Sequence, residues 1–348
     1  RLRDHAKQNG PREFYAAVSA RLDSLDGDVE TLLDSRTRGL GRALFAPINN
    51  GRVELITMQV PLTDHVILAP TAQLRPLVTA WSAAGPVGAV AVGIDEVRII
   101  DLRFGLANEV ATIPHPEEIA DRRELTGKGH ATVSTTYHSS ASHHDLFEQR
   151  EEDRLLRYLH SLGGKIAAYA RDLGWACMAL TGEVKYVQAA AAGLPSGQAA
   201  DVVKLPHTVS GLTPPKLAGV VEPALAEARA KRCLGLAQRA RDAAFSANAE
   251  AGACGLAPTL AALQEGRVSH LLLTVDGEWR GNRAPDGTLV TEFDVPPGAT
   301  ADQLTPEPRL DERMIELAFR DGAAITVLDA RTAAPLADTE GIGALLRW

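Results

Sequence analysis

Apolar residues recur at two different periods along this chain, and the change between them predicts alternating helices and strands. Apolar residues from Phe14 to Leu25 lie three or four positions apart, which predicts an amphipathic helix over residues 11–33. The β-rich runs 43–45 and 53–56 flank an Asn-Asn-Gly sequence that is typical of a hairpin turn, and strands are expected to continue to Leu68. Residues 74–81 again have a helical pattern, and the Gly-Pro break that follows predicts a domain boundary at residue 85.

The pattern over the next 130 or so residues predicts a second unit that begins with strands and continues with helices. Three β-rich runs predict an opening meander, at residues 87–94, 97–104 and 107–113. After a polar stretch, apolar residues at helical spacing predict a long helix from Leu146 to about Leu173, with Gly163-Gly164 as a point where it can kink. A strand, a short helix and another strand are then expected, at residues 177–180, 184–192 and 202–205.

The third unit opens with a helical pattern that runs from Thr213 to about residue 251. Helices and strands then alternate, with an insertion rich in Gly, Pro and Asp over residues 276–308. Such alternation predicts an α/β sandwich. We therefore expect three domains, at residues 1–85, 86–212 and 213–348.

The composition limits what kind of protein this is. The 348 residues include 36 Lys and Arg against 44 Asp and Glu, a formal net charge of −8, so any contact with RNA has to be local. No apolar run approaches the roughly 18 to 20 residues that cross a bilayer. The three cysteines, Cys177, Cys233 and Cys254, predict neither a disulfide framework nor a zinc site, and a cytoplasmic location is expected. The sequence begins at Arg1 without a methionine, so whether further residues precede Arg1 stays open.

The last eight residues carry a resemblance to a known family. Gly341-Ile342-Gly343-Ala344-Leu345-Leu346-Arg347-Trp348 resembles the G-G-I-G-x-L-L-R-aromatic ending of archaeal and eukaryotic class-I peptide chain release factors and their Pelota relatives. The predicted elements of residues 85–348 also follow the order found in that family. The resemblance implies a bacterial member, similar to Balon-like or Vms-like relatives. It implies an α/β (α+β) architecture of three domains, with a mixed sheet and a long helix in the middle domain and a C-terminal α/β/α sandwich.

The catalytic motif of that family is missing from the expected place. In release factors, Gly-Gly-Gln in the loop before the long middle helix positions water against the peptidyl-tRNA ester, whereas residues 127–145 contain no glutamine. Ser196-Gly197-Gln198 is the nearest match, but it follows that helix and is predicted to be a plain turn. Gln149 is a weak catalytic candidate, since a charged helical face is the simpler interpretation. No Asn-Ile-Lys-Ser codon-reading motif is found in the first unit either.

Histidines and basic residues are the candidates for contact with RNA. Four of the ten histidines lie between residues 130 and 144, where imidazoles could contact RNA or act as acid or base, and His138 and His143 are weak catalytic candidates. The spacing matches no metal motif, so we expect no metal site and no cofactor. A solvated, salt-bridged surface is the alternative interpretation for the basic residues. The candidate RNA-binding residues are Arg122, Arg123, Lys128, His130, His138, His143, His144, Arg150, Arg229, Lys231, Arg232 and Arg239.

The resemblance implies that the chain binds the ribosomal A site, with the middle domain directed towards the peptidyl-transferase centre. The first hypothesis is a non-hydrolytic hibernation or stalled-ribosome factor. Two alternatives remain open: a peptidyl-tRNA hydrolase for ribosome rescue, and a module that binds structured RNA off the ribosome. The expected partners are ribosomal RNA and P-site tRNA, with a translational GTPase such as elongation factor Tu as a further candidate, and neither membrane nor DNA is expected.

Overall fold

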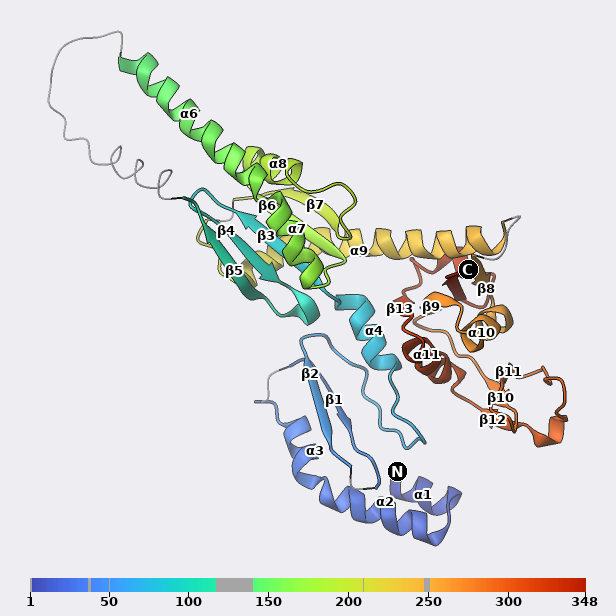
Figure 1. The fold of residues 1–348 in the computed structure, drawn as a ribbon. Helices are drawn as coiled ribbons and strands as arrows, with labels where there is room; N and C mark the ends of the chain where they lie inside the picture. The colour runs from blue at the N-terminus through green and yellow to red at the C-terminus, as the bar shows by residue number, and fades with distance from the viewer. Residues whose placement is uncertain (1, 37–38, 50, 117–139, 209, 247–250) are drawn as a thin grey trace. The chain divides into compact units, whose positions relative to one another are not determined.

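Figure 1 shows the fold in the computed structural model, which describes residues 2–36, 39–49, 51–116, 140–208, 210–246 and 251–348. The chain divides into two compact units. One contains residues 1–84 together with residues 230–348, and the other contains residues 85–229. The three-domain division at residues 85 and 212 stays a prediction.

The unit of residues 85–229 is built on a mixed sheet of five strands. The strands are β3 (Val87–Val92), β4 (Glu96–Asp101), β5 (Asn108–Pro114), β6 (Cys177–Gly182) and β7 (Asp201–Pro206). Their spatial order is β5-β4-β3-β6-β7, in which β3 pairs antiparallel with β4 and parallel with β6. Every residue of β3 and β6 is buried. These two strands are uninterrupted small and apolar runs in the sequence because both faces of the sheet are covered.

Helices cover both faces of this sheet. They are α6 (Ser140–Ser161), α7 (Gly163–Asp172), α8 (Val184–Ala192) and the long α9 (Pro214–Ala244). Helices α6, α7 and α8 pack on one face, where Leu155, Leu159 and Ile166 are buried. The first half of α9 packs on the other face through Leu217 and Leu225. The mixed sheet and the long helix that the resemblance implies are confirmed, as is the kink, since α6 and α7 meet at Leu162.

The N-terminal part of the other unit consists of three helices and a hairpin. They are α1 (Leu2–Asn9), α2 (Arg12–Ser24), α3 (Asp26–Leu33), β1 (Gly41–Phe45) and β2 (Glu54–Met58). The predicted hairpin is confirmed by the antiparallel pairing of β1 with β2. Two predictions are wrong: the helix over 11–33 is interrupted at Leu25, and strands end at Met58 rather than Leu68. Prolines at 61 and 70 lack the backbone N–H that a strand ladder needs.

The C-terminal part of the same unit is a four-stranded sheet between helices. Its strands are β8 (Gly252–Cys254), β9 (Val268–Thr274), β13 (Ala324–Leu328) and β14 (Ile342–Leu346), in the order β13-β9-β14-β8. One face is covered by α10 (Leu256–Gln264), α11 (Leu310–Arg320) and α4 (Arg75–Ala84), whose Val78 joins the core. The other face carries the second half of α9, through Leu236, Ala237 and Ala240. The predicted C-terminal sandwich is confirmed.

The insertion between β9 and α11 has a small sheet of its own. Its strands are β10 (Gly281–Arg283), β11 (Leu289–Thr291) and β12 (Thr305–Glu307), and β10 pairs antiparallel with both neighbours. Strands of three residues have no readable alternation, so the sequence analysis identified only an insertion rich in Gly, Pro and Asp here. Within the described part of the chain, none of the helices combines the length and apolar character needed to span a bilayer.

Candidate functional site

The candidate site of the unit of residues 85–229 is the segment between β5 and α6, and the structure shows how the end of β5 is held. His115 follows β5, and its backbone N–H donates to the carbonyl oxygen of Asp95 over 2.9 Å. The His115 ring lies edge-on to the ring of Tyr158 on α6, with centroids 5.4 Å apart. The Tyr158 hydroxyl donates to the carbonyl oxygen of Pro114 over 3.2 Å. The last turns of α6 are thereby tied to the strand from which the segment departs.

The predicted residues of this segment fall into two groups. Arg122, Arg123, Lys128, His130 and His138 lie outside the described residues. His143, His144, Gln149 and Arg150 lie on α6, where Gln149 and Arg150 are exposed. Figure 1 shows the first turns of α6 extending beyond the sheet that its last turns cover. The catalytic and RNA-binding roles of all these residues stay predictions.

Ser196-Gly197-Gln198, the nearest match to Gly-Gly-Gln, lies in a turn between α8 and β7. Gly197 has a φ of 80°, a left-handed conformation that glycine adopts without strain. The predicted turn is confirmed.

A second group of basic residues lies on α9. Arg229 is partly buried and forms an ion pair with Glu222, two turns earlier on the same helix, so its charge is matched. Lys231, Arg232 and Arg239 are exposed. Arg241, at the end of the run, donates to the carboxylate of Asp338 and to the carbonyl oxygen of Pro335, which fixes the end of α9 to the C-terminal domain.

Arg232 and Arg239 are two helical turns apart, and both act on one histidine. His270 of β9 shares a hydrogen bond of 2.8 Å with the hydroxyl of Thr326 on β13. Burial, together with the nearby charges of Arg232 and Arg239, lowers the pKa of His270 to about 4. The imidazole is therefore neutral at physiological pH, and the two arginines form a local positive surface over it. We call Arg232, Arg239 and His270 the α9 basic surface.

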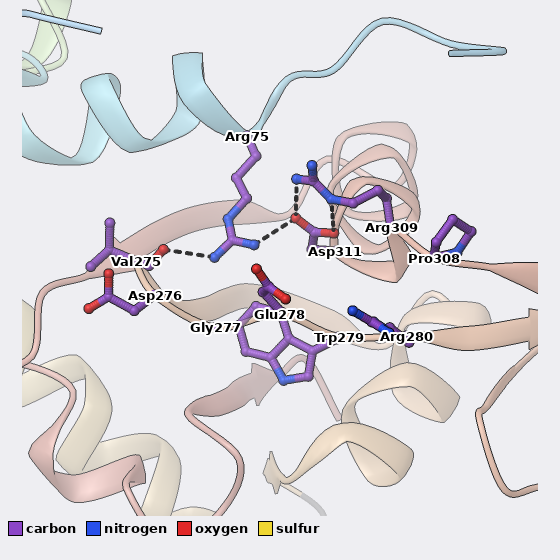
Figure 2. Close-up of a pocket in the computed structure, with 10 residues that line it drawn as sticks. All are labelled: Arg75, Val275, Asp276, Gly277, Glu278, Trp279, Arg280, Pro308, Arg309 and Asp311. Atoms are coloured by element: carbon purple, nitrogen blue, oxygen red, sulfur yellow. Dashed lines mark hydrogen bonds and ion pairs between the residues drawn. The ribbon is translucent and has the colours of Figure 1, made fainter. Parts of the chain in front are cut away.

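Figure 2 shows a third feature, a pocket of about 570 Å³ at the start of α4. Arg75 donates to the carboxylate of Asp311 over 2.7 Å and to the carbonyl oxygens of Thr274 and Val275. Its guanidinium also lies 5.3 Å from the ring centroid of Trp279. Arg309 donates to both carboxylate oxygens of Asp311 from the other side.

The pKa values of the two neighbouring carboxylates move in opposite directions. Burial raises the pKa of Asp311, but hydrogen bonds from Arg309 and Arg75 outweigh it, so the net pKa is lowered. Burial raises the pKa of Glu312, although this carboxylate accepts the backbone N–H groups of Leu74 and Arg75. These charges are matched by one another, so the cluster holds α4 against the C-terminal sheet. The sequence pattern gives no sign of it, because Arg75 and Asp311 are 236 positions apart.

Among the residues that the structure describes, His, Cys, Asp and Glu side chains form no group of three or more that could hold a metal ion.

Comparison with known proteins finds one family whose model matches part of the chain. Residues 107–244 match the model of bacterial archaeo-eukaryotic release factor family 2. The matched region contains β5, the segment before α6 and all of α6 to α9. The sequence matches no curated protein.

Three solved structures illustrate the structural likeness. Archaeal Pelota, from a model of ribosome-bound archaeal Pelota and ABCE1, is 17% identical with a TM-score of 0.44, covering 88% of this chain and 77% of that one. Dom34 of S. cerevisiae, a translation termination-like factor, is 9% identical with a TM-score of 0.40, covering 78% of this chain and 64% of that one. The archaeal translation termination factor aRF1 is 14% identical with a TM-score of 0.25, covering 100% of this chain and 86% of that one.

Proposed function

We propose that this chain binds the ribosomal A site as a translation factor that does not hydrolyse peptidyl-tRNA, because residues 107–244 match the model of bacterial archaeo-eukaryotic release factor family 2. The observation that carries the proposal is the match over residues 107–244 combined with the absence of glutamine from residues 115–148. The region that would reach the peptidyl-transferase centre is present, and the side chain that positions water there is not. Such a factor occupies idle or stalled ribosomes.

The anchoring of the segment before α6 supports this role. A loop that reaches into a ribosomal cavity needs a rigid base, because each ordered residue costs about 1–2 kcal/mol of conformational entropy on binding. His115 and Tyr158 provide such a base, since they tie β5 to α6 where the segment begins. Arg150 adds an exposed cation on the same helix, about two turns before Tyr158.

The α9 basic surface supports contact with RNA despite the net charge of −8. Arg232 and Arg239 are both exposed, and the imidazole of His270 beneath them is neutral. Binding of a phosphate group there would offset the repulsion between the two guanidinium groups. Lys231, the exposed residue before Arg232 on α9, adds a further cation next to this surface.

The test is co-sedimentation of the full chain with vacant and with translating ribosomes over a salt series. We expect binding that weakens as salt rises, because contacts with phosphates release counterions. The double variant R232E/R239E should bind at least tenfold more weakly and reduce the slope of log affinity against log salt by about 1 to 2. The matched control is R52E/R171E, which reverses two exposed arginines outside α9 and should leave binding unchanged. Absence of ribosome binding at low salt contradicts the proposal.

A peptidyl-tRNA hydrolysis assay on the bound fraction separates the proposal from its main alternative. Binding without hydrolysis supports an occluding factor. Hydrolysis that is lost in H138A/H143A, with binding retained, would show instead that the chain is a rescue enzyme with imidazole chemistry. Binding to extracted RNA but not to whole ribosomes would favour a structured-RNA module. Repeating the sedimentation with and without elongation factor Tu and GTP tests the further prediction of a translational GTPase partner.

A further inference from the structure

The insertion of residues 276–308 is firmly attached to the C-terminal domain. Gln264 of α10 both donates to the carbonyl oxygen of Leu289 and accepts its N–H, over 2.9 and 2.7 Å. Trp279 is buried, and its indole N–H donates to the carbonyl oxygen of Glu340. The small sheet β11-β10-β12 therefore has a fixed position on the core of this domain.

The connection from β11 to β12 presents one aromatic side chain to solvent. Phe293 is 92% exposed, the highest value among the large hydrophobic side chains that the structure describes, and Val295 nearby is 48% exposed. The turn that carries Phe293 is held by its own hydrogen bonds. The hydroxyl of Thr291 donates to the carboxylate of Asp294 over 2.5 Å, and the N–H of Asp294 donates to the carbonyl oxygen of Thr291. Phe293 thus projects from an ordered turn, which reduces the entropy lost on binding.

The insertion that carries Phe293 is predominantly acidic. Residues 276–308 include seven acidic and two basic residues, and one of the two, Arg283, pairs with Glu307 over 2.8 Å. Glu292 and Asp294 flank Phe293 directly and are exposed. The insertion therefore carries a net charge of −5 out of −8 for the whole chain. RNA phosphates would be repelled by this surface, whereas a basic protein would be attracted.

We propose that the Phe293 turn, residues 291–295, docks into an apolar pocket with a rim of Lys and Arg on a basic protein of the ribosome. The aromatic ring supplies buried apolar area, and the two carboxylates select a cationic rim. This partner surface rests on the proposed ribosomal function and deepens it, because it assigns a protein contact to the C-terminal domain in addition to the RNA contact of α9.

The test places a photo-crosslinking benzoylphenylalanine at residue 293 of the full chain and irradiates the complex with purified ribosomes. The substitution leaves the core intact, since the Phe293 side chain is exposed. The matched control places the same group at Phe319, which is 58% exposed on α11 and adjoins Arg320. We expect position 293 to crosslink to one ribosomal protein and position 319 not to crosslink to that protein.

Charge reversal tests whether the carboxylates of Glu292 and Asp294 select a cationic partner. The variant E292K/D294K and the variant F293S should each bind ribosomes about tenfold more weakly, and E292K/D294K should also lose the crosslink from position 293. Co-sedimentation with a crosslink to ribosomal RNA alone, or with no crosslink, overturns the protein contact and leaves the proposed function standing. Failure of the unmodified chain to co-sediment removes the proposed function and this inference together.

Discussion

The ring of His115 lies edge-on against the ring of Tyr158, with the two planes at 88° and the centroids 5.4 Å apart. One residue follows the last residue of β5, and the other lies on the buried side of α6 beside Leu159. The end of β5, from which the segment before α6 departs, is therefore held to the last turns of α6 by an aromatic pair and a hydrogen bond.

Removal of the Tyr158 ring should weaken the attachment of the end of β5 to α6. We expect Y158A to lower the free energy of unfolding of the unit of residues 85–229 by about 1–2 kcal/mol, and Y158F by about 0.5–1 kcal/mol, because the latter loses only the hydrogen bond to Pro114. Urea unfolding combined with amide hydrogen exchange of β4 and β5 measures both. The control is R157A, whose exposed guanidinium donates to the backbone of its own helix and should change stability by under about 0.5 kcal/mol. Equal effects of Y158A and R157A would contradict the role of the pair.

The adjacent glycines Gly163 and Gly164 differ in whether the fold leaves room for a side chain. A Cβ atom on Gly163 would lie 2.0 Å from the carbonyl carbon of Gly193, whereas one on Gly164 would have no neighbour within 4 Å. We expect G163A to destabilise the middle unit by about 3 kcal/mol, because α7 and the end of α8 could no longer approach. G164A should be neutral or stabilising by about 0.5 kcal/mol, since alanine is the better helix former. Thermal and urea unfolding measure the stability of the two variants. Similar free energies of unfolding for G163A and G164A would refute the close approach of Gly163 to Gly193.

The sequence predicts the elements that carry strong periodicity and misses those that depend on distant contacts. The helix predicted over residues 184–192 coincides with α8, and the strand predicted at 177–180 lies within β6. Both have a clear apolar pattern because their apolar side chains pack in the core of their own unit. The short β8 and β10 to β12 have no such pattern. The kink was predicted from the two glycines, but the close approach of Gly193, at the end of α8, to Gly163 is not readable from sequence spacing.

The candidate site was only partly predictable for the same reason. Helical spacing places Arg232 and Arg239 on one side of α9, but their effect on His270 depends on the packing of α9 over β9. Arg229 and Arg241 belong to the same basic run, and the fold pairs them with Glu222 and Asp338. Composition cannot identify these pairs, because they depend on which carboxylates the fold brings near.

Arg75 and Asp311 offer a test of the cluster that holds α4. We expect R75M to lower the free energy of unfolding of its unit by about 3 kcal/mol near pH 7, because the buried Asp311 carboxylate would lose one of its two cations. The folded-state pKa of Asp311 is lowered, so its stabilising contribution is present above the ordinary aspartate pKa and is lost as pH falls through the folded value. The difference between wild type and R75M should therefore shrink at acid pH.

The control for this prediction is R280M, which removes an exposed arginine that lines the same pocket. It should change stability by under about 0.5 kcal/mol at every pH. The double variant R75M/D311N should recover part of the loss at pH 7, because the uncompensated charge is removed with its partner. A loss in the double variant equal to the sum of the two single losses would show that Arg75 and Asp311 do not interact.

His270 should make stability depend on pH in a second, separate window. Its folded-state pKa of about 4 lies below the ordinary value of 6.5, so the unfolded chain binds the proton more readily between these values. Stability should therefore fall as pH decreases from about 6.5 towards 4, by up to about 3 kcal/mol from this group. In H270Q this component is absent, so urea unfolding should show the two proteins converging as the pH is lowered. A constant difference between them from pH 7.5 to 4.5 would contradict the prediction.

The same histidine reports on the α9 basic surface. Replacement of both cations in R232Q/R239Q should raise the pKa of His270 but leave it below its ordinary value, because burial is the larger cause of the shift and remains. An NMR titration of the His270 ring measures this directly. If the surface binds RNA as proposed, phosphates close to Arg232 and Arg239 should raise the pKa of His270 in the wild type, since they offset the two positive charges. No change on binding of ribosomal RNA would place the RNA contact elsewhere on the chain, whatever the affinity measured by sedimentation.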